Sequence, residues 1–200
     1  MSSSINAEKS SSLPKLALHL QNYFGAPDQI ASVLGERFQR ETLNKGELHT
    51  SLSSYRCKLS FIVNGHLRVF RQTEAKEVTQ WIASEGEFIT DLNALFFGEP
   101  SRWNIQALND CELYSIDSMQ YQHFVQDHPE WRVTEQVFLS KCFITLEERV
   151  FSLLSMSAEE RYQYFYSQKK ELFHQVPQQY LASLLGMTPE TFSRIRAKLL

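Results

Sequence analysis

The chain ends in VPQQYLASLLGMTPETFSRIRAKLL, from Val176 to Leu200. Pro177 suits the first position of a helix, where its missing N–H removes no hydrogen bond. Gly186 can end that helix because glycine readily adopts a positive φ. Thr188 is a good N-cap and Pro189 a good first residue for a second helix. The pattern predicts two short helices joined by a sharp turn.

The second of these helices has two chemically different sides. At about 100° per residue, its apolar side chains separate from its polar and small ones. The apolar side holds Phe192, Ile195 and Leu199, and the opposite side holds Glu190, Ser193, Arg194 and Ala197. Small Ala182 in the first helix lets the two helices cross closely. The segment is therefore predicted to be a helix-turn-helix whose second helix keeps one side in solvent.

That solvent side fits the recognition of DNA bases. Arginine can donate two hydrogen bonds to guanine, and a carboxylate can accept one from cytosine. We expect DNA contacts from Arg194 and Glu190 and from the polar residues around them: Gln178, Gln179, Thr188, Thr191, Ser193, Arg196 and Lys198. The alternative is a helical hairpin that serves only for packing and has a solvated charged face.

The charge distribution agrees with a DNA-binding tail. The formal net charge of the chain is −3, which by itself argues against a nucleic-acid partner. Residues 169–200, however, hold five Lys and Arg residues against two Glu residues. A basic segment on an acidic body is expected where only that segment meets a polyanion.

Upstream, residues 36–117 have the composition of short β-strands. Asn64-Gly65 lies between two β-rich runs, in Leu59–Gln72, and this dipeptide predicts a hairpin. The further strand-like runs are Phe38–Asn44, Glu77–Ala83, Trp103–Leu108 and Cys111–Asp117. Short strands at this spacing favour a sandwich or a barrel.

Helical patterns flank this block. Residues 16–23 and 28–34 precede it, and Ser118 is expected to cap a short helix that follows it. The longest candidate runs from Glu130 to about Met156, without Gly or Pro. Ser157 and Glu160 then match a capping box, which predicts the start of another helix.

The long helix carries two apolar stripes. The first has heptad spacing and consists of Leu139, Phe143, Leu146, Val150 and Leu153. The second consists of Val133, Val137, Ile144, Phe151 and Leu154. One stripe is expected to face the β block and the heptad stripe a second subunit. The alternative is a single wide stripe that faces the core of a monomer.

Other functional classes have little support in the sequence. Cys57, Cys111 and Cys142 form neither a metal motif nor a disulfide framework, and the histidines lack metal-site spacing. We therefore expect no catalytic residues and no metal. The chain has no run of about 18 apolar residues, and its start, MSSSINAEKSSSLP, is read as a flexible tail. We expect a cytoplasmic protein without a membrane partner.

In this order, the β block, long helix and helix-turn-helix resemble the Crp/Fnr family of bacterial transcription regulators. LSFIVNGHLRVFR resembles the family's β-roll, and RVFSLLSMSAEERY and VPQQYLASLLGMTPETFSRIR resemble one large branch of it. The resemblance implies an α+β homodimer with an eight-stranded antiparallel β-roll, a long dimerisation helix and a C-terminal helix-turn-helix. It implies double-stranded DNA, a second copy of the chain and RNA polymerase as partners.

The resemblance also divides the chain into parts. It gives a tail at 1–15, a sensor β-roll at 16–128, a dimerisation helix at 129–156 and a DNA-binding part at 157–200. The family's recognition residues correspond to Glu190 and Arg194. Pro189 stands where cyclic-AMP receptors have a further arginine, so a different operator is expected.

For the effector, the resemblance points to two pairs of residues. Gly86-Glu87 matches the pair that holds the ribose of a cyclic nucleotide. Ser101-Arg102 lies where an Arg-Ser pair would hold its phosphate, in reversed order. A shift of one residue in an extended segment turns a side chain to the other face. A cyclic nucleotide, a different small effector and no effector therefore remain alternatives.

Two other functions stay open at the level of sequence. One is a ligand-binding or scaffolding protein whose helix-turn-helix contacts protein. The other is an enzyme on a cupin-like barrel, which would need a cluster of metal ligands or a nucleophile and base.

Overall fold

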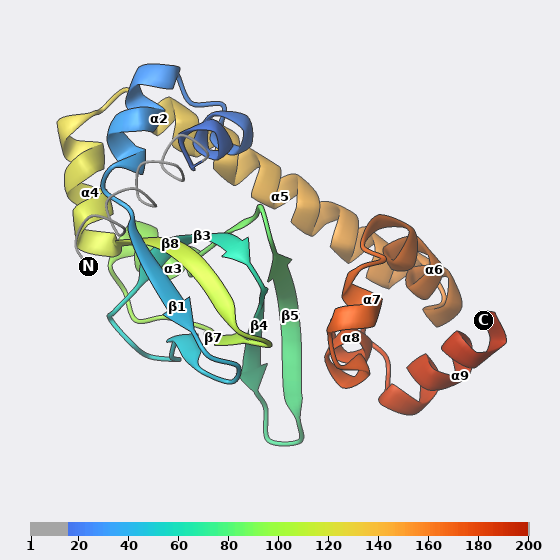
Figure 1. Ribbon diagram of the computed structural model, residues 1–200. Coiled ribbons are helices and arrows are strands. Elements are labelled where there is room, and N and C mark those ends of the chain that lie inside the picture. Colours follow the sequence, from blue (N-terminus) through green and yellow to red (C-terminus); the bar gives the residue numbers. More distant parts are fainter. Residues whose placement is uncertain (1–15, 200) are drawn as a thin grey trace, which may run out of the picture.

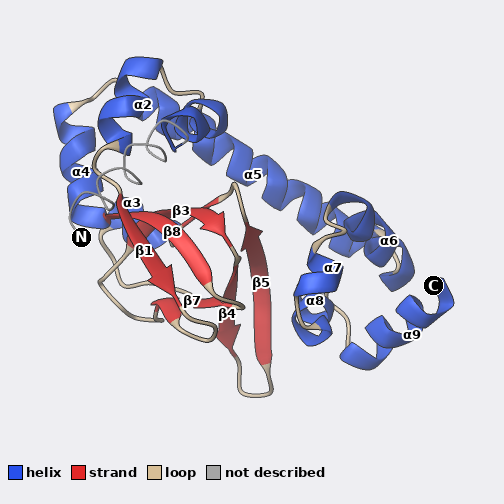
Figure 2. Cartoon of the chain, in the orientation of Figure 1, coloured by secondary structure: helices blue, strands red, loops and turns tan. Residues whose placement is uncertain are grey.

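The computed structural model describes residues 16–199 as a β-roll joined by one long helix to a group of short helices (Figure 1). The tail predicted at residues 1–15 lies outside the described residues. Figure 2 shows that the strands gather in one body and that the C-terminal body is wholly helical. The predicted α+β fold with a β-roll is thus confirmed.

Within the described residues, eight strands form two four-stranded antiparallel sheets. One sheet has the order β1-β8-β3-β6 and the other the order β2-β7-β4-β5. The bounds are β1 Gln39–Leu43, β2 Leu48–Thr50, β3 Lys58–Asn64, β4 His66–Gln72, β5 Glu77–Ser84, β6 Phe88–Ile89, β7 Asn104–Ala107 and β8 Cys111–Asp117. The short strands β2 and β6 escaped the sequence analysis because two or three residues carry no readable period.

The hairpin predicted at Asn64-Gly65 is wrong. β3 pairs with β8 and β6, whereas β4 pairs with β5 and β7, so the turn carries the chain from one sheet to the other. Gly65 has a φ of 102°, and an added Cβ would lie 2.6 Å from the Sγ of Cys111. The glycine is therefore required by close packing at a corner of the roll. The hydrogen-bonded hairpin is instead β4–β5, which starts from the pair Gln72 and Glu77.

The two sheets enclose a packed interior. Apolar side chains from both sheets, among them Ile62, Leu67, Ile105 and Leu113, are fully buried there. Polar groups inside the roll bind one another: His49 Nε2 lies 2.7 Å from Ser60 Oγ, which lies 2.8 Å from Ser115 Oγ. Burial lowers the pKa of His49 to about 4, so this side chain is neutral at pH 7.

A second core forms where helices cover one end of the roll. The helical residues 16–24, α2 (Asp28–Gly35), α4 (Ser118–Asp127) and the start of α5 (Trp131–Ser155) surround it. The ring of Phe24 lies 4.9 Å from Phe88 and 4.7 Å from Phe138. The cap of α4 is Asp117, whose side chain accepts from Met119 N–H, and not Ser118 as the sequence predicted.

Helix α5 buries a narrower face than the sequence predicted. Its buried residues are Trp131, Thr134 and Phe138, all near its start. All ten residues of the two predicted stripes are exposed. The single core-facing stripe is thus wrong, and so is the prediction that one stripe packs on the β block. Both stripes lie open in the single chain.

The C-terminal body contains α6 (Ala158–Gln168), α7 (Leu172–Gln175), α8 (Gln178–Leu184) and α9 (Pro189–Leu199), and the roll contains α3 (Leu92–Phe97). The capping box at Ser157 and Glu160 is confirmed. No helix in residues 16–199 is both long and apolar enough to span a bilayer. Nor do His, Cys, Asp or Glu residues gather anywhere in that range into a group that could hold a metal ion.

Replacing Gly65 tests the corner of the roll. We expect Gly65→Ala to lower the free energy of unfolding by about 1–3 kcal/mol from overpacking, in addition to about 1–3 kcal/mol from backbone strain. Gly46→Ala is the matched control, because its φ is 90° but no atom lies within 4 Å of an added Cβ. Urea denaturation of both variants measures the difference, and equal losses would contradict the steric explanation.

Candidate nucleic-acid interface

The turn between α8 and α9 has the geometry that the sequence predicted. Gly186 has a φ of 66°, and an added Cβ would lie 3.0 Å from Leu153 Cδ2 on α5. The hydroxyl of Thr188 accepts from the Thr191 N–H at 3.2 Å, which caps α9. Pro177 stands just before α8 rather than as its first residue. Glycine and cap together fix the angle between the two helices.

The inner side of α9 is anchored by aromatic packing. Phe192 and Ile195 are buried. The ring of Phe192 lies 5.1 Å from Tyr162 of α6 and 5.8 Å from Phe173 of α7. Leu199, which we expected on this side, is 41% exposed. Two buried residues therefore hold the helix.

The outer side of α9 is open to solvent. Glu190, Ser193 and Arg194 are exposed, and within residues 16–199 Arg194 forms neither an ion pair nor a side-chain hydrogen bond. Hydrogen bonds from Thr188 and from its own N–H lower the pKa of Glu190, so its carboxylate is charged at pH 7. An unpaired cation and an exposed carboxylate thus lie one turn apart on this surface.

The other residues predicted to contact DNA differ in how exposed they are and in whether they are already paired. Gln178 and Gln179, at the start of α8, and Thr188 are exposed, whereas Thr191 and Arg196 are half-buried. Lys198 Nζ lies 2.9 and 2.8 Å from the two carboxylate oxygens of Glu159 on α6. This lysine would have to give up an ion pair before it could meet a phosphate.

A buried arginine connects helix α8 to the roll. The guanidinium of Arg68 on β4 lies 4.2 Å from the ring of Phe70 and 4.0 Å from that of Tyr180 on α8. Its Nε donates to Thr79 Oγ1 at 2.9 Å, and Nη1 pairs with Glu77 at 2.8 Å. Arg68 was not among the predicted residues, because an arginine within a strand is normally expected to be exposed to solvent.

Further contacts join the same two parts. The Thr79 N–H donates to Ser183 Oγ of α8 at 2.9 Å, and the ring of His66 bonds to the side chain of Gln175. Ile82 and Leu108 of the roll share a buried cluster with the apolar residues of α8 and α9. The positions of α8 and α9 are therefore set by the outer face of β4 and β5.

The first predicted effector pair takes part in this contact. Glu87 forms an ion pair with Lys169, which follows α6, and accepts from the Ser84 N–H at 3.1 Å. Gly86, with a φ of 83°, donates its N–H to Ile62 O at 2.9 Å. Glu87 therefore connects the roll to the segment between α6 and α7.

The second predicted pair is organised by an internal carboxylate. Asp91, buried at the start of α3, accepts from the Ser101 hydroxyl and the Arg102 N–H, both at 2.7 Å. It also accepts from the N–H groups of Asn93, Ala94 and Trp103. Ser101 is thus buried and bonded, and the Arg102 side chain is exposed. Neither Glu87 nor Ser101 lines either of the two hollows described below.

Asp91 was not among the predicted residues, although the local sequence indicates that it caps a helix. Asp before the helical run LNALFF is a good N-cap. Its bonds to residues ten positions later could not be read in the same way, because they depend on how the loop folds back.

The predicted dimer interface lies on α5, between the two bodies of the chain. Leu139, Phe143, Leu146, Val150 and Leu153 are between 38% and 60% exposed. They form a continuous strip along the helix. Such a run of exposed apolar side chains is unusual on a monomer and is typical of an interaction surface.

Comparisons with known proteins agree with this architecture. The family Cyclic nucleotide-binding domain matches residues 40–128. No curated protein is significantly similar to the chain in sequence.

Solved structures resemble the chain over most of its length. FixK2 from Bradyrhizobium japonicum has a TM-score of 0.68 at 15% identity, over 81% of this chain and 84% of that one. The c-di-GMP responsive global regulator CLP from Xanthomonas campestris has a TM-score of 0.65 at 18% identity, over 86% of this chain and 91% of that one. The catabolite activator protein of Thermus thermophilus has a TM-score of 0.55 at 21% identity, over 90% of this chain and 86% of that one. CLP is named as a global regulator, and the Thermus thermophilus protein as a catabolite activator. Residues 40–128 therefore match a cyclic nucleotide-binding domain, and the chain as a whole has the fold of the Crp/Fnr transcription regulators, as the sequence motifs predicted.

Proposed function

We propose that this chain is a sequence-specific DNA-binding regulator of the Crp/Fnr type that acts as a homodimer. The observation that carries the proposal is that Glu190 and Arg194 are both exposed on the outer side of α9. A helix held by Phe192 and Ile195 presents these two side chains rigidly, which base recognition requires.

The chemistry of this surface divides into base and phosphate contacts. Arg194 is positioned to donate to guanine O6 and N7, and Glu190 to accept from cytosine N4. Ser193 and Thr191 lie beside them. Residues at the helix starts, Gln178, Gln179 and Thr188, suit phosphate oxygens, because free N–H groups and the helix dipole attract anions there. Arg196 is the flanking cation that remains without a carboxylate partner among the described residues.

The dimer is proposed to form through the heptad strip of α5. Two strips packed in parallel would cover apolar side chains that now meet water. Two-fold symmetry would set the two α9 helices about 34 Å apart, so the operator would be an inverted repeat. The proposed division is a sensor at 16–128, a dimerisation helix at 129–156 and a DNA-binding part at 157–200, with RNA polymerase as a further partner.

Replacing Arg194 tests base recognition. For an operator selected from a random DNA pool, Arg194→Ala is expected to weaken binding by about 1–3 kcal/mol, the contribution of one bidentate contact. Binding to unrelated duplex at low salt should change little. Arg56→Ala is the control, because Arg56 is exposed in a loop of the roll. Fluorescence anisotropy measures both affinities, and an equal loss on every sequence would contradict base reading.

Charges on α5 test the dimer. Leu146→Glu together with Val150→Glu is expected to give monomers, because two carboxylates per chain would be buried without partners in the interface. Ile144→Glu with Phe151→Glu on the second stripe is the matched pair and should leave dimers. Sedimentation measures the mass of each. An unchanged dimer in the first pair would remove the heptad strip from the interface.

A further inference from the structure

A hollow of about 210 Å³ lies where α5, α6 and α8 meet β5. Its walls therefore come from the roll, the long helix and the DNA-binding part at once. The aromatic side chains in the lining are Trp81, Tyr164 and Phe165. The charged side chains in the lining are Arg149, Arg161, Lys169 and Glu148.

The two arginines in this hollow have neutral partners. Arg149 donates through Nη1 to Gln80 O and through Nη2 to Leu184 O, the latter at 2.9 Å. Arg161 donates to Leu185 O at 2.9 Å and to Met156 O at 2.6 Å. Neither forms an ion pair with another residue in the range 16–199.

This arrangement leaves positive charge without compensation. Burial lowers the pKa of Arg149 to about 10, with no opposing effect from a carboxylate. Lys169 is paired with Glu87, and Glu148 is the one carboxylate in the lining of the hollow. A guanidinium group has five N–H donors. Each of the two arginines donates to two backbone carbonyls, so donors remain free on both side chains. An anion in the hollow would find both charge and free donors.

The size and the walls restrict that anion. A cavity of roughly 150 Å³ can hold a benzene ring, whereas drug-sized ligands need at least about 300 Å³. One aromatic ring with a carboxylate therefore fits. The face of Trp81 is suited to stack on such a ring, with the acid group turned to the arginines.

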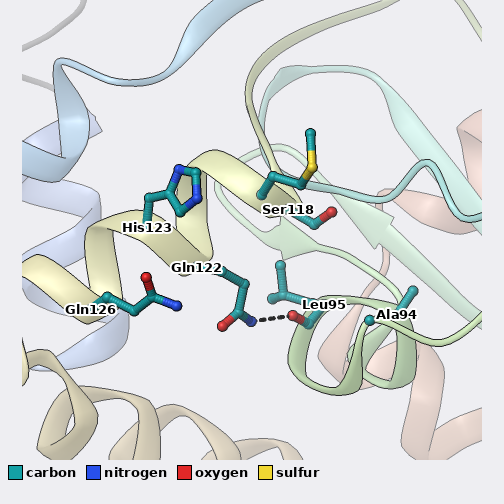
Figure 3. A pocket seen from close by; sticks show the side chains of 8 residues that line it. Ala94, Leu95, Ser118, Gln122, His123 and Gln126 are labelled. Atoms are coloured by element: carbon teal, nitrogen blue, oxygen red, sulfur yellow. Dashed lines mark hydrogen bonds between the residues drawn. The ribbon is translucent and has the colours of Figure 1, made fainter.

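A second hollow lacks these properties. It lies between α3 and α4 and is lined by neutral groups and His123, as Figure 3 shows, and Gln122 there already donates to Leu95 O. It contains neither arginine nor lysine.

We propose that the hollow between α5, α6, α8 and β5 binds a small planar organic anion, with its carboxylate between Arg149 and Arg161 and its ring against Trp81. The binding of this anion does not depend on the proposed function. Its role as an effector does depend on that function: because the same residues join the roll to the DNA-binding part, the bound anion would change the position of α9.

Salicylate is the probe, and salicylamide is its uncharged match. In ¹H–¹⁵N spectra of the unmodified full chain, salicylate is expected to shift the indole N–H of Trp81 and not those of Trp103 and Trp131. Calorimetry should show salicylamide binding about tenfold more weakly or worse, the effect of one charge-assisted hydrogen bond. No shift at Trp81, or equal affinity for the two compounds, would overturn the proposal.

Filling the hollow gives an independent test. Ser152→Phe should weaken salicylate binding by at least about tenfold, since the ring would take the ligand's place. Ser140→Phe is the matched control: both serines lie on α5 and donate to a helix carbonyl, Arg149 O and Gln136 O. Unchanged binding in Ser152→Phe would place salicylate elsewhere and overturn the proposal. No DNA is present in either test, so a failure of DNA binding would not affect the result.

Discussion

The buried guanidinium of Arg68 is the interaction on which the arrangement of the two bodies depends. It is 1% exposed and lies between the rings of Phe70 and Tyr180. A desolvated cation–π contact contributes about 2 kcal/mol, and an arginine buried without partners would be far more costly. Thr79 and Glu77 supply those partners. The helix that carries Tyr180 is the first of the helix-turn-helix, so this contact also fixes where α9 points.

The contact joins the surface of the roll to the helices that we propose bind DNA. Besides Arg68, the pairs Thr79–Ser183 and Glu87–Lys169 cross the same boundary. A carboxylate that resembles a ligand-binding residue in sequence thus acts as a connection between parts. Any change that moves β4 and β5 would be transmitted to α8 through these bonds. The hollow that we propose binds an anion adjoins the same boundary, so an occupant would lie close to the contacts that position α8.

Helix α5 has two separate tasks along its length. Its first turns, at Trp131, Thr134 and Phe138, complete the aromatic core at the end of the roll. Its later turns carry apolar side chains that the chain itself leaves exposed, while Arg149 faces the hollow. One helix therefore joins the proposed subunit contact, the proposed effector and the recognition helix. A second subunit packed on α5 would restrict the movement of the helix that leads into α6–α9.

Local patterns in the sequence determined the features that depend on neighbouring residues. Caps at Thr188 and Ser157, the positive φ of Gly186 and the buried pair Phe192 and Ile195 all follow from residues at most four positions apart. The recognition surface was predictable for this reason. Only the tertiary structure decided contacts between distant residues. Asn64-Gly65 turned out to be a corner between sheets, because strand pairing and not turn chemistry selects the partner of β3. Glu87 and Lys169 meet across 82 positions, and Arg68 meets Tyr180 only once the roll and α8 have packed. No pattern along the chain encodes such pairs, because they follow from how completed elements fit together.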